Sequence, residues 1–158
     1  MMTQQTKSNE RPWDWTPPKG VNRMMSTVLR LPLVHSVMSK SLMLISFTGK
    51  KSGKQYTTPV GYYRDGKRIL IVTKRFRAWW QNFVAPAPVT LRLQGRDVAG
   101  TALSIADEAT IIPLMTQIAE GAPQQAEIFH IEMVDGKPAA DSVRQIAPKI
   151  VIIEVTLA

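Results

Sequence analysis

The sequence contains no cysteine among its 158 residues, and this absence excludes several kinds of chemistry at once. A disulfide framework, a thiolate nucleophile, zinc-finger ligation and a cysteine-held iron–sulfur cluster all need that residue. Histidine is scarce as well, because only His35 and His130 occur. Without the His-Glu-x-x-His spacing of metalloproteases, these two residues predict no metal site. We interpret both histidines as structural or surface residues.

Long apolar runs are also missing, since a stretch such as residues 42–45 is far shorter than the roughly 20 residues of a membrane-spanning helix. The N-terminus has no uninterrupted apolar segment of the kind found in signal peptides. We therefore expect a cytoplasmic protein. The G-x-S-x-G motif of serine hydrolases is absent, and the basic loop at 49–54 does not have the residue order of a Walker A phosphate loop.

What the chain does contain is typical of one globular domain, with 44% apolar and 20% charged residues. A chain of this length buries roughly 70% of the surface that its unfolded form exposes, so it can fold without disulfides or metal. The charge is uneven. Residues 1–80 hold 15 Lys or Arg against three Asp or Glu, a net charge of +12, whereas residues 81–158 hold five against nine, a net charge of −4. The basic first half indicates an anionic partner, which could be a nucleic acid, a membrane surface or a phosphorylated small molecule.

The first 20 residues differ from the rest of the chain. They are polar, contain three prolines and show no apolar period, a composition that predicts a flexible N-terminal tail. Trp13 and Trp15 are the exceptions, and we expect them to pack on the domain surface because exposed indole is unfavourable in water. The single folded domain is expected to span 21–158.

A helical pattern follows in residues 21–38, where apolar side chains recur at steps of three and four. Pro32 interrupts the pattern, which predicts two short amphipathic helices within 21–40. They could pack on the core. Alternatively, their basic outer face could make peripheral contact with a membrane surface or with a hydrophobic substrate.

Beyond residue 41 the apolar period becomes the alternation of β-strands. We expect strands at 42–48, 56–64, 68–73, 89–94, 98–105 and 149–157. Turn-forming residues separate them, namely a glycine-bounded basic loop at 49–55, the pair Asp65-Gly66, and Gly95-Arg96-Asp97.

Two helices are expected between or after these strands. The first is a short helix at 78–83. The second covers 107–119, with Asp107 as its N-cap and Gly121 just past its end. Residues 121–148 give no clear assignment. Six strands joined mainly by antiparallel turns predict a mainly β fold, a small β-barrel with flanking helices.

The loop at 49–54 carries the clearest functional signal. Gly49 and Gly53 allow the backbone to approach an anion closely. The side chains that add charge and a hydroxyl are Lys50, Lys51, Ser52 and Lys54. Phosphate is the natural ligand of such a loop, but a run of charges between strands can also be a solvated turn.

Residues further along could extend a site around this loop. Lys74, at the end of a strand, could place a second cation beside it, and Trp79 and Trp80 could form the wall for a planar ring or could be core residues. Tyr56 and the two indoles could also stack on nucleic acid bases. No RNA-binding signature is present, however, and the acidic second half would repel a long polyanion. We therefore predict a small-molecule ligand and no nucleic acid.

Five short motifs occur in a fixed order over residues 42–103. They are TGKKSG at 48–53, Thr58-Pro59, the Asp65-Gly66 turn, the strand end at Lys74, and WWQNF at 79–83. Together they resemble the deazaflavin-dependent nitroreductase family. The resemblance implies a split β-barrel of the FMN-binding type with flanking helices, and coenzyme F420, a deazaflavin, as the hydride donor.

The resemblance also implies which residues bind this cofactor. The residues that would hold its phosphate or polyglutamate tail are Lys50, Lys51 and Ser52. Those whose backbone would line its ring are Pro59, Val60 and Gly61. Those that would complete the groove are Thr73, Lys74, Ala78, Trp79 and Asn82. No catalytic acid or base is implied, because the cofactor itself carries the chemistry.

The sequence departs from the family pattern on the substrate side. Quinone- and nitro-reducing members carry a tyrosine where this chain has Gly61, and tyrosines in a C-terminal segment that has none here. We expect an F420-dependent reductase of the nitroreductase or quinone reductase type, with a quinone-like or other conjugated lipophilic acceptor. The alternative is a non-catalytic protein on the same barrel that binds F420, FMN, haem or a fatty acid.

Overall fold

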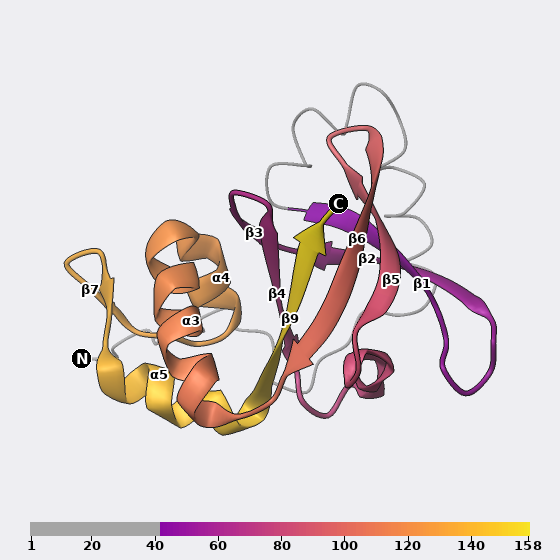
Figure 1. The fold of residues 1–158 in the computed structure, drawn as a ribbon. Coiled ribbons are helices and arrows are strands. Elements are labelled where there is room, and N and C mark those ends of the chain that lie inside the picture. The colour runs from indigo at the N-terminus through magenta and orange to yellow at the C-terminus, as the bar shows by residue number, and fades with distance from the viewer. Residues whose placement is uncertain (1–41) are drawn as a thin grey trace, which may run out of the picture.

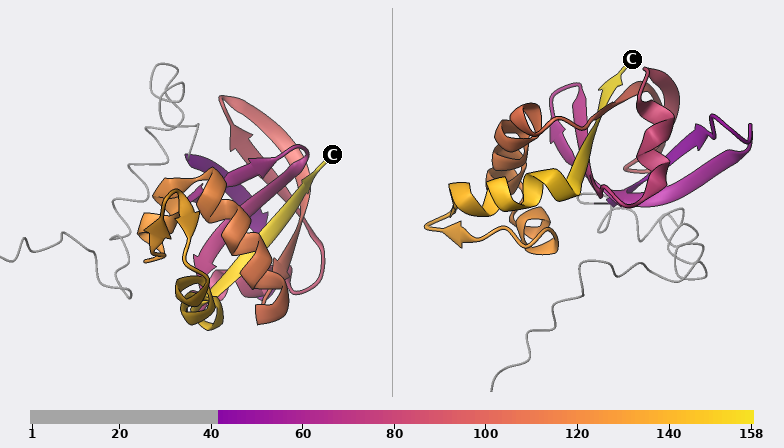
Figure 2. Two further views of the ribbon diagram at one scale, coloured as in Figure 1. Left: turned by 90° about the vertical axis from the view of Figure 1, so that its left-hand side faces the viewer. Right: turned by 90° about the horizontal axis from the view of Figure 1, so that it is seen from below.

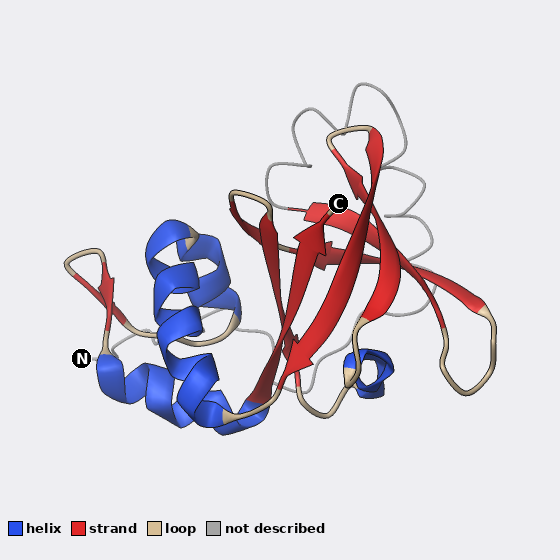
Figure 3. Ribbon diagram, viewed as in Figure 1, coloured by secondary structure: helices blue, strands red, loops and turns tan. Residues whose placement is uncertain are grey.

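The computed structural model describes residues 42–158. The expected tail at 1–20, the helices at 21–40 and residues Trp13, Trp15 and His35 lie outside the described residues. The main sheet contains seven antiparallel strands in the order β2-β1-β5-β6-β9-β4-β3. The bounds of these strands are β1 Leu42–Thr48, β2 Gln55–Gly61, β3 Tyr63–Asp65, β4 Arg68–Lys74, β5 Ala87–Leu93, β6 Arg96–Ile105 and β9 Ile150–Leu157. The sheet curls into a barrel, with the helices of the second half of the chain gathered on one side and the short 3-10 helix η1 (Ala78–Phe83) apart from them (Figures 1 and 3).

The two edges of this sheet are connected directly through the chain. β2 ends at Gly61 on one edge and β3 begins at Tyr63 on the other, so that Tyr62 alone joins them. The single strand expected at 56–64 is therefore wrong, because the segment changes partner at Tyr62, from β1 to β4. The Tyr62 side chain is buried in the barrel interior. This change of partner turns an open sheet into a split barrel.

The hairpin turns depend on residues in the left-handed backbone region. Gly66 follows β3 with φ +61°, as the expected Asp65-Gly66 turn requires. The next turn differs from the expectation of Gly95-Arg96-Asp97. Its two central residues are Gln94 and Gly95, with φ of 48° and 79°, a pair of positive angles that favours tight hairpins. Arg96 and Asp97 instead begin β6.

The strands separate two hydrophobic clusters. One fills the barrel and includes Ile45, Ile71 and Ile153, all with no exposed surface. The other lies between the sheet and the helices and includes Ile152 and Ile111. Successive residues of β9 thus point into different cores, and Ile150 to Ile153 are all fully buried. A strand buried on both faces shows no polar alternation, which explains its irregular sequence pattern.

The helical layer is formed by the second half of the chain (Figure 2). Its elements are α3 Glu108–Gly121, α4 Pro123–Ile128, the hairpin of β7 Met133–Val134 and β8 Lys137–Pro138, α5 Ala140–Ile146 and the 3-10 helix η2 Ala147–Lys149. The Asp107 cap is confirmed, because its carboxylate accepts a hydrogen bond from the Thr110 N–H at 3.0 Å. None of the helices within 42–158 is both long and apolar enough to cross a membrane.

Gly121 does not lie past the end of α3 but is its last residue. A Cβ atom there would come within 2.3 Å of the Tyr63 ring. The glycine is therefore explained by the close approach of α3 to β3, and not by a left-handed helix cap. Residues 121–148 gave no clear sequence assignment, and after the end of α3 this segment forms short helices and a two-stranded hairpin that pack beside α3.

Candidate functional site

The basic loop between β1 and β2 is folded back on itself. The Gly49 N–H donates to the Lys54 carbonyl at 2.8 Å, and the Gly53 N–H donates to the Gly49 carbonyl at 2.9 Å. Gly53 has φ +68°, a conformation that favours glycine. The Ser52 hydroxyl accepts a hydrogen bond from the Lys54 N–H at 3.3 Å. These contacts give the loop a defined shape before any ligand binds.

The lysines of this loop have no acidic partner in the described part of the chain. The side chains of Lys50, Lys51 and Lys54 are exposed. None of the ion pairs within residues 42–158 involves them. Three positive charges within five residues therefore remain without local compensation, an arrangement that attracts a compact anion.

Asn82 connects the loop to the 3-10 helix η1, which spans Ala78–Phe83. Its side-chain oxygen accepts a hydrogen bond from the Lys50 N–H at 2.8 Å. Its side-chain amide donates to the Trp79 carbonyl at 2.7 Å. Both ends of the Asn82 carboxamide are thus engaged within the protein. Asn82 thus holds the loop against η1, and its place beside the cofactor groove, which the resemblance implies, stays a prediction.

Trp79 joins this cluster to the barrel. Its indole N–H donates to the Thr73 hydroxyl at 3.0 Å, and the Thr73 side chain is buried. The Trp79 ring stacks on Phe47, with ring centroids 5.8 Å apart, and meets the edge of Phe83 at 5.9 Å. Trp80 instead donates to the Arg75 carbonyl. The loop, η1 and the end of β4 consequently form one connected structure.

Arginines at the end of β4 have contrasting surroundings. The Arg75 guanidinium donates to the carbonyls of Pro148, Ala106 and Ile150, and so fixes the end of β4 to the start of β9. Arg77, just before η1, has a buried Nε without a hydrogen-bond partner in the described residues. Burial lowers the pKa of Arg77. Sequence analysis did not identify Arg77, because no motif marks it.

The other predicted residues lie in two places. Lys74 ends β4, and Ala78 begins η1, close in sequence to Trp79. Pro59, Val60 and Gly61 lie at the opposite end of β2 from the basic loop. At about 3.3 Å per residue, β2 spans roughly 20 Å between these ends.

The far end of β2 presents two faces. The Val60 side chain packs against the barrel core. Pro59 and Gly61 therefore face away from the barrel interior, because strand side chains alternate, and the Gly61 position faces Gln125 of α4. Burial raises the pKa of the adjacent Tyr62, more than the nearby Arg64 lowers it, and its phenol therefore stays neutral at neutral pH. A ligand that reaches both groups of predicted residues must be elongated, because roughly 20 Å of β2 separates them.

Replacing Asn82 with leucine is expected to release the loop from η1. The change removes two hydrogen bonds, each worth about 0.5–1.5 kcal/mol, while keeping the side-chain size. Hydrogen exchange of the Lys50 amide, followed by NMR, should become at least about tenfold faster. Gln81→Leu, at the exposed neighbouring position of η1, is the control. Unchanged protection of the Lys50 amide in Asn82→Leu would contradict this structural role.

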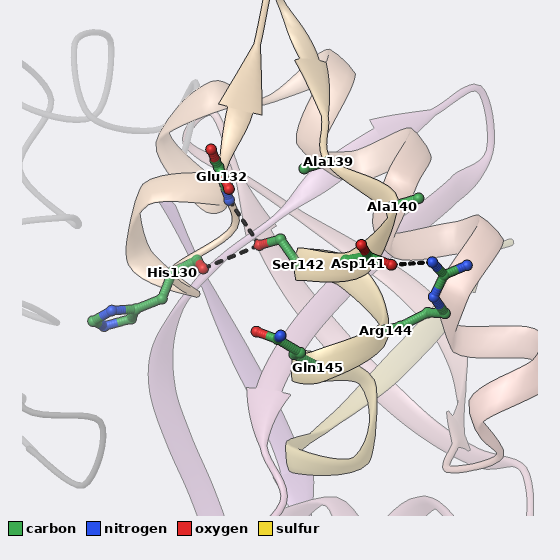
Figure 4. A pocket seen from close by; sticks show the side chains of 8 residues that line it. All are labelled: His130, Glu132, Ala139, Ala140, Asp141, Ser142, Arg144 and Gln145. Carbon is green, nitrogen blue, oxygen red and sulfur yellow. Dashed lines mark hydrogen bonds and ion pairs between the residues drawn. The ribbon is translucent and has the colours of Figure 1, made fainter.

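A shallow depression of about 460 Å³ lies elsewhere, beside α5 (Figure 4). The Ser142 hydroxyl there accepts from the Glu132 N–H at 2.8 Å, and the Arg144 guanidinium pairs with Asp141. None of the predicted site residues lines the depression. Within 42–158, no group of three or more acidic or histidine side chains could hold a metal ion.

Comparison with known proteins places these features in context. Residues 21–126 match a family model described as F420H(2)-dependent quinone reductase. No curated protein matches the chain. Among solved structures, a chain described as a domain-swapped dimer is 17% identical, with 84% of this chain and 92% of that chain covered and a TM-score of 0.53. This likeness shows the fold.

Two further solved structures are similar to this chain, with lower TM-scores. One is the general stress FMN/FAD binding protein from Xanthomonas citri, 13% identical, with 89% of this chain and 85% of that chain covered and a TM-score of 0.49. The other is described as an F420-H2 dependent reductase. It is 16% identical, with 73% of this chain and 94% of that chain covered and a TM-score of 0.47. The fold is the mainly β split barrel with flanking helices that the resemblance implied.

Proposed function

Because the chain belongs to the F420H(2)-dependent quinone reductase family, whose model covers residues 21–126, we propose that it is an F420-dependent oxidoreductase with a quinone-like or other conjugated lipophilic acceptor. When bound, the reduced deazaflavin would supply the hydride. The observation that carries this proposal is the family match, which includes both the basic loop and β2. A nitro compound is a second acceptor class to test.

The basic loop fits the anionic tail of this cofactor. Lys50, Lys51 and Lys54 are exposed and have no carboxylate partner among the described residues. The Ser52 hydroxyl lies in the same loop, where it can donate to a phosphate oxygen. In the proposed complex, these side chains hold the phosphate or the polyglutamate chain, and Asn82 keeps the loop backbone in place. Charge-assisted hydrogen bonds of this kind are the strong ones in protein sites.

The end of β2 that lies far from the basic loop suits the deazaflavin ring. β2 is an edge strand whose neighbour in the sheet is β1, so its other edge can offer backbone groups to a ligand. In the proposed complex, Pro59, Val60 and Gly61 line the ring, while Thr73, Lys74, Ala78 and Trp79 border the groove nearer the loop. FMN, which also joins a flat ring to a phosphate, is the alternative cofactor.

The residues of this chain would then bind and orient the reactants without taking part covalently. The described site contains no cysteine and no cluster of ligands for a metal. The reaction class requires neither, because a hydride carrier brings its own chemistry. The protein contributes binding, orientation and the exclusion of water.

The direct test is titration of the purified protein with F420, followed by cofactor fluorescence and then by turnover. We expect binding in the micromolar range or tighter, and oxidation of reduced F420 when a quinone such as menadione is added. FMN is titrated in parallel to rank the two cofactors. Absence of F420 binding would overturn the proposal. Binding without turnover on any quinone or nitro compound would favour the non-catalytic alternative.

A further inference from the structure

Two buried polar residues occur in the described structure, Thr73 and Gln125, each 4% exposed. The Thr73 hydroxyl has a partner, the Trp79 indole. The carboxamide of Gln125, on α4, has no hydrogen bond to any group within residues 42–158, and only its backbone N–H donates, to the Ala122 carbonyl. A nearly buried amide that forms no hydrogen bond is unusual, because burial removes its contacts with water.

The Gln125 carboxamide is nevertheless reachable from outside. The side-chain atoms that are fully buried without a partner belong to Arg77 and Arg92, not to Gln125. Both polar atoms of Gln125 therefore keep some accessible surface although the residue as a whole is 96% buried. The small exposed surface of the residue therefore includes its two polar atoms.

The Gln125 carboxamide lies against Gly61, the last residue of β2. A Cβ atom on Gly61 would come within 2.5 Å of the Gln125 Nε2 and 3.7 Å of its Oε1. Glycine at this position thus gives the space over β2 to the carboxamide from α4. The proposed ring site on β2 and the unpartnered carboxamide of Gln125 consequently meet at one point.

We propose that the Gln125 carboxamide is a binding group for the cofactor ring, a step that rests on the proposed function. A primary carboxamide offers one donor and one acceptor side by side. Flavin and deazaflavin rings carry a cyclic imide with adjacent C=O and N–H groups, which matches this pair. The ligand completes the hydrogen bonds that the folded protein leaves open, and Gln125 therefore favours rings with an imide edge.

The test is the variant Gln125→Met, which keeps the length of the side chain and removes its hydrogen bonds. Gln124→Met is the matched control, because Gln124 is the exposed neighbour on the same helix. Affinity is measured for F420 and for its ring-and-ribityl fragment, which lacks phosphate and glutamate. We expect Gln125→Met to weaken both about tenfold, and Gln124→Met to change neither.

Although Gln125→Met is expected to weaken ligand binding, it is expected to stabilise the ligand-free protein. Removing a buried, unpartnered amide is expected to raise the Tm by about 2–4 °C. A lower Tm for Gln125→Met would overturn the proposal, because it would show that the carboxamide stabilises the fold. Gln125→Leu provides the same comparison if the methionine variant does not fold.

The outcomes separate this inference from the proposed function. If the wild-type protein does not bind F420, the proposed function fails. If it binds F420 and both Gln125 variants bind the ring fragment as tightly as the wild type, the function stands and the role of Gln125 is overturned. Weaker binding of F420 with unchanged binding of the fragment would also overturn it, because the effect would then lie at the tail.

Discussion

Replacing Lys50, Lys51 and Lys54 together with glutamine is expected to weaken F420 binding about hundredfold. The three ammonium groups are the uncompensated charges of the loop, and each exposed charge contributes on the order of 1 kcal/mol to an anionic ligand. Lys51→Ala alone should cost about fivefold. Fluorescence titration at several salt concentrations measures the effect, and wild-type affinity should fall as ionic strength rises.

The control for this triple variant removes three positive charges from positions outside the loop. Lys67, Arg96 and Lys137 are exposed and lie outside the proposed site, so their triple replacement with glutamine should leave affinity within about twofold. The ring fragment without the tail should bind the loop variant as it binds the wild type. Equal losses in both triple variants would show a general effect of net charge, and the loop would then have no specific role.

Phe83→Ala is expected to lower the free energy of unfolding by about 3–5 kcal/mol, the usual cost of deleting a buried phenylalanine ring. Phe83 is 1% exposed and lies beneath η1, where its ring meets the edges of Phe47 and Trp79 at 5.2 and 5.9 Å. The loss is a large part of the 5–15 kcal/mol that stabilises a typical domain. Urea denaturation measures it, and Tm should fall by about 10 °C.

Phe83→Leu is the matched variant because it keeps most of the buried volume, and it should cost about 1–1.5 kcal/mol. Since Asn82 and Trp79 are held by the same helix, F420 affinity should also fall in Phe83→Ala at temperatures where the protein is still folded. A loss of stability below about 1 kcal/mol in Phe83→Ala would contradict the close packing of η1 on the barrel.

Local sequence patterns predicted several elements correctly. The strand at 42–48 is confirmed with its bounds, and so are the short helix at 78–83 and the Asp107 cap. Alternation of apolar residues, prolines after a helix and a capping carboxylate act over a few residues, so they can be identified without the fold. The family motifs between residues 48 and 83 are likewise short local patterns, and the split barrel that the resemblance implied is confirmed.

Other features depend on contacts between distant residues. The segment 56–64 reads as one strand, and only the curled sheet decides that it changes partner at Tyr62. The irregular pattern of β9 reflects burial between two cores. The position of the Gln94-Gly95 turn depends on the register of β5 and β6, in which Arg92 pairs with Asp97 across the strands.

The candidate site also combines features that local sequence predicts with features that depend on contacts between distant residues. The sequence by itself determined that residues 49–54 form a compact basic loop between strands, because glycine spacing and charge are local properties. Only the tertiary structure decided that Asn82 holds Lys50 from 32 residues away, and that Gln125 fills the space over Gly61. The physical reason is that a hydrogen bond or a close approach between distant residues is set by how the barrel and helices pack. No local pattern in the sequence records that packing.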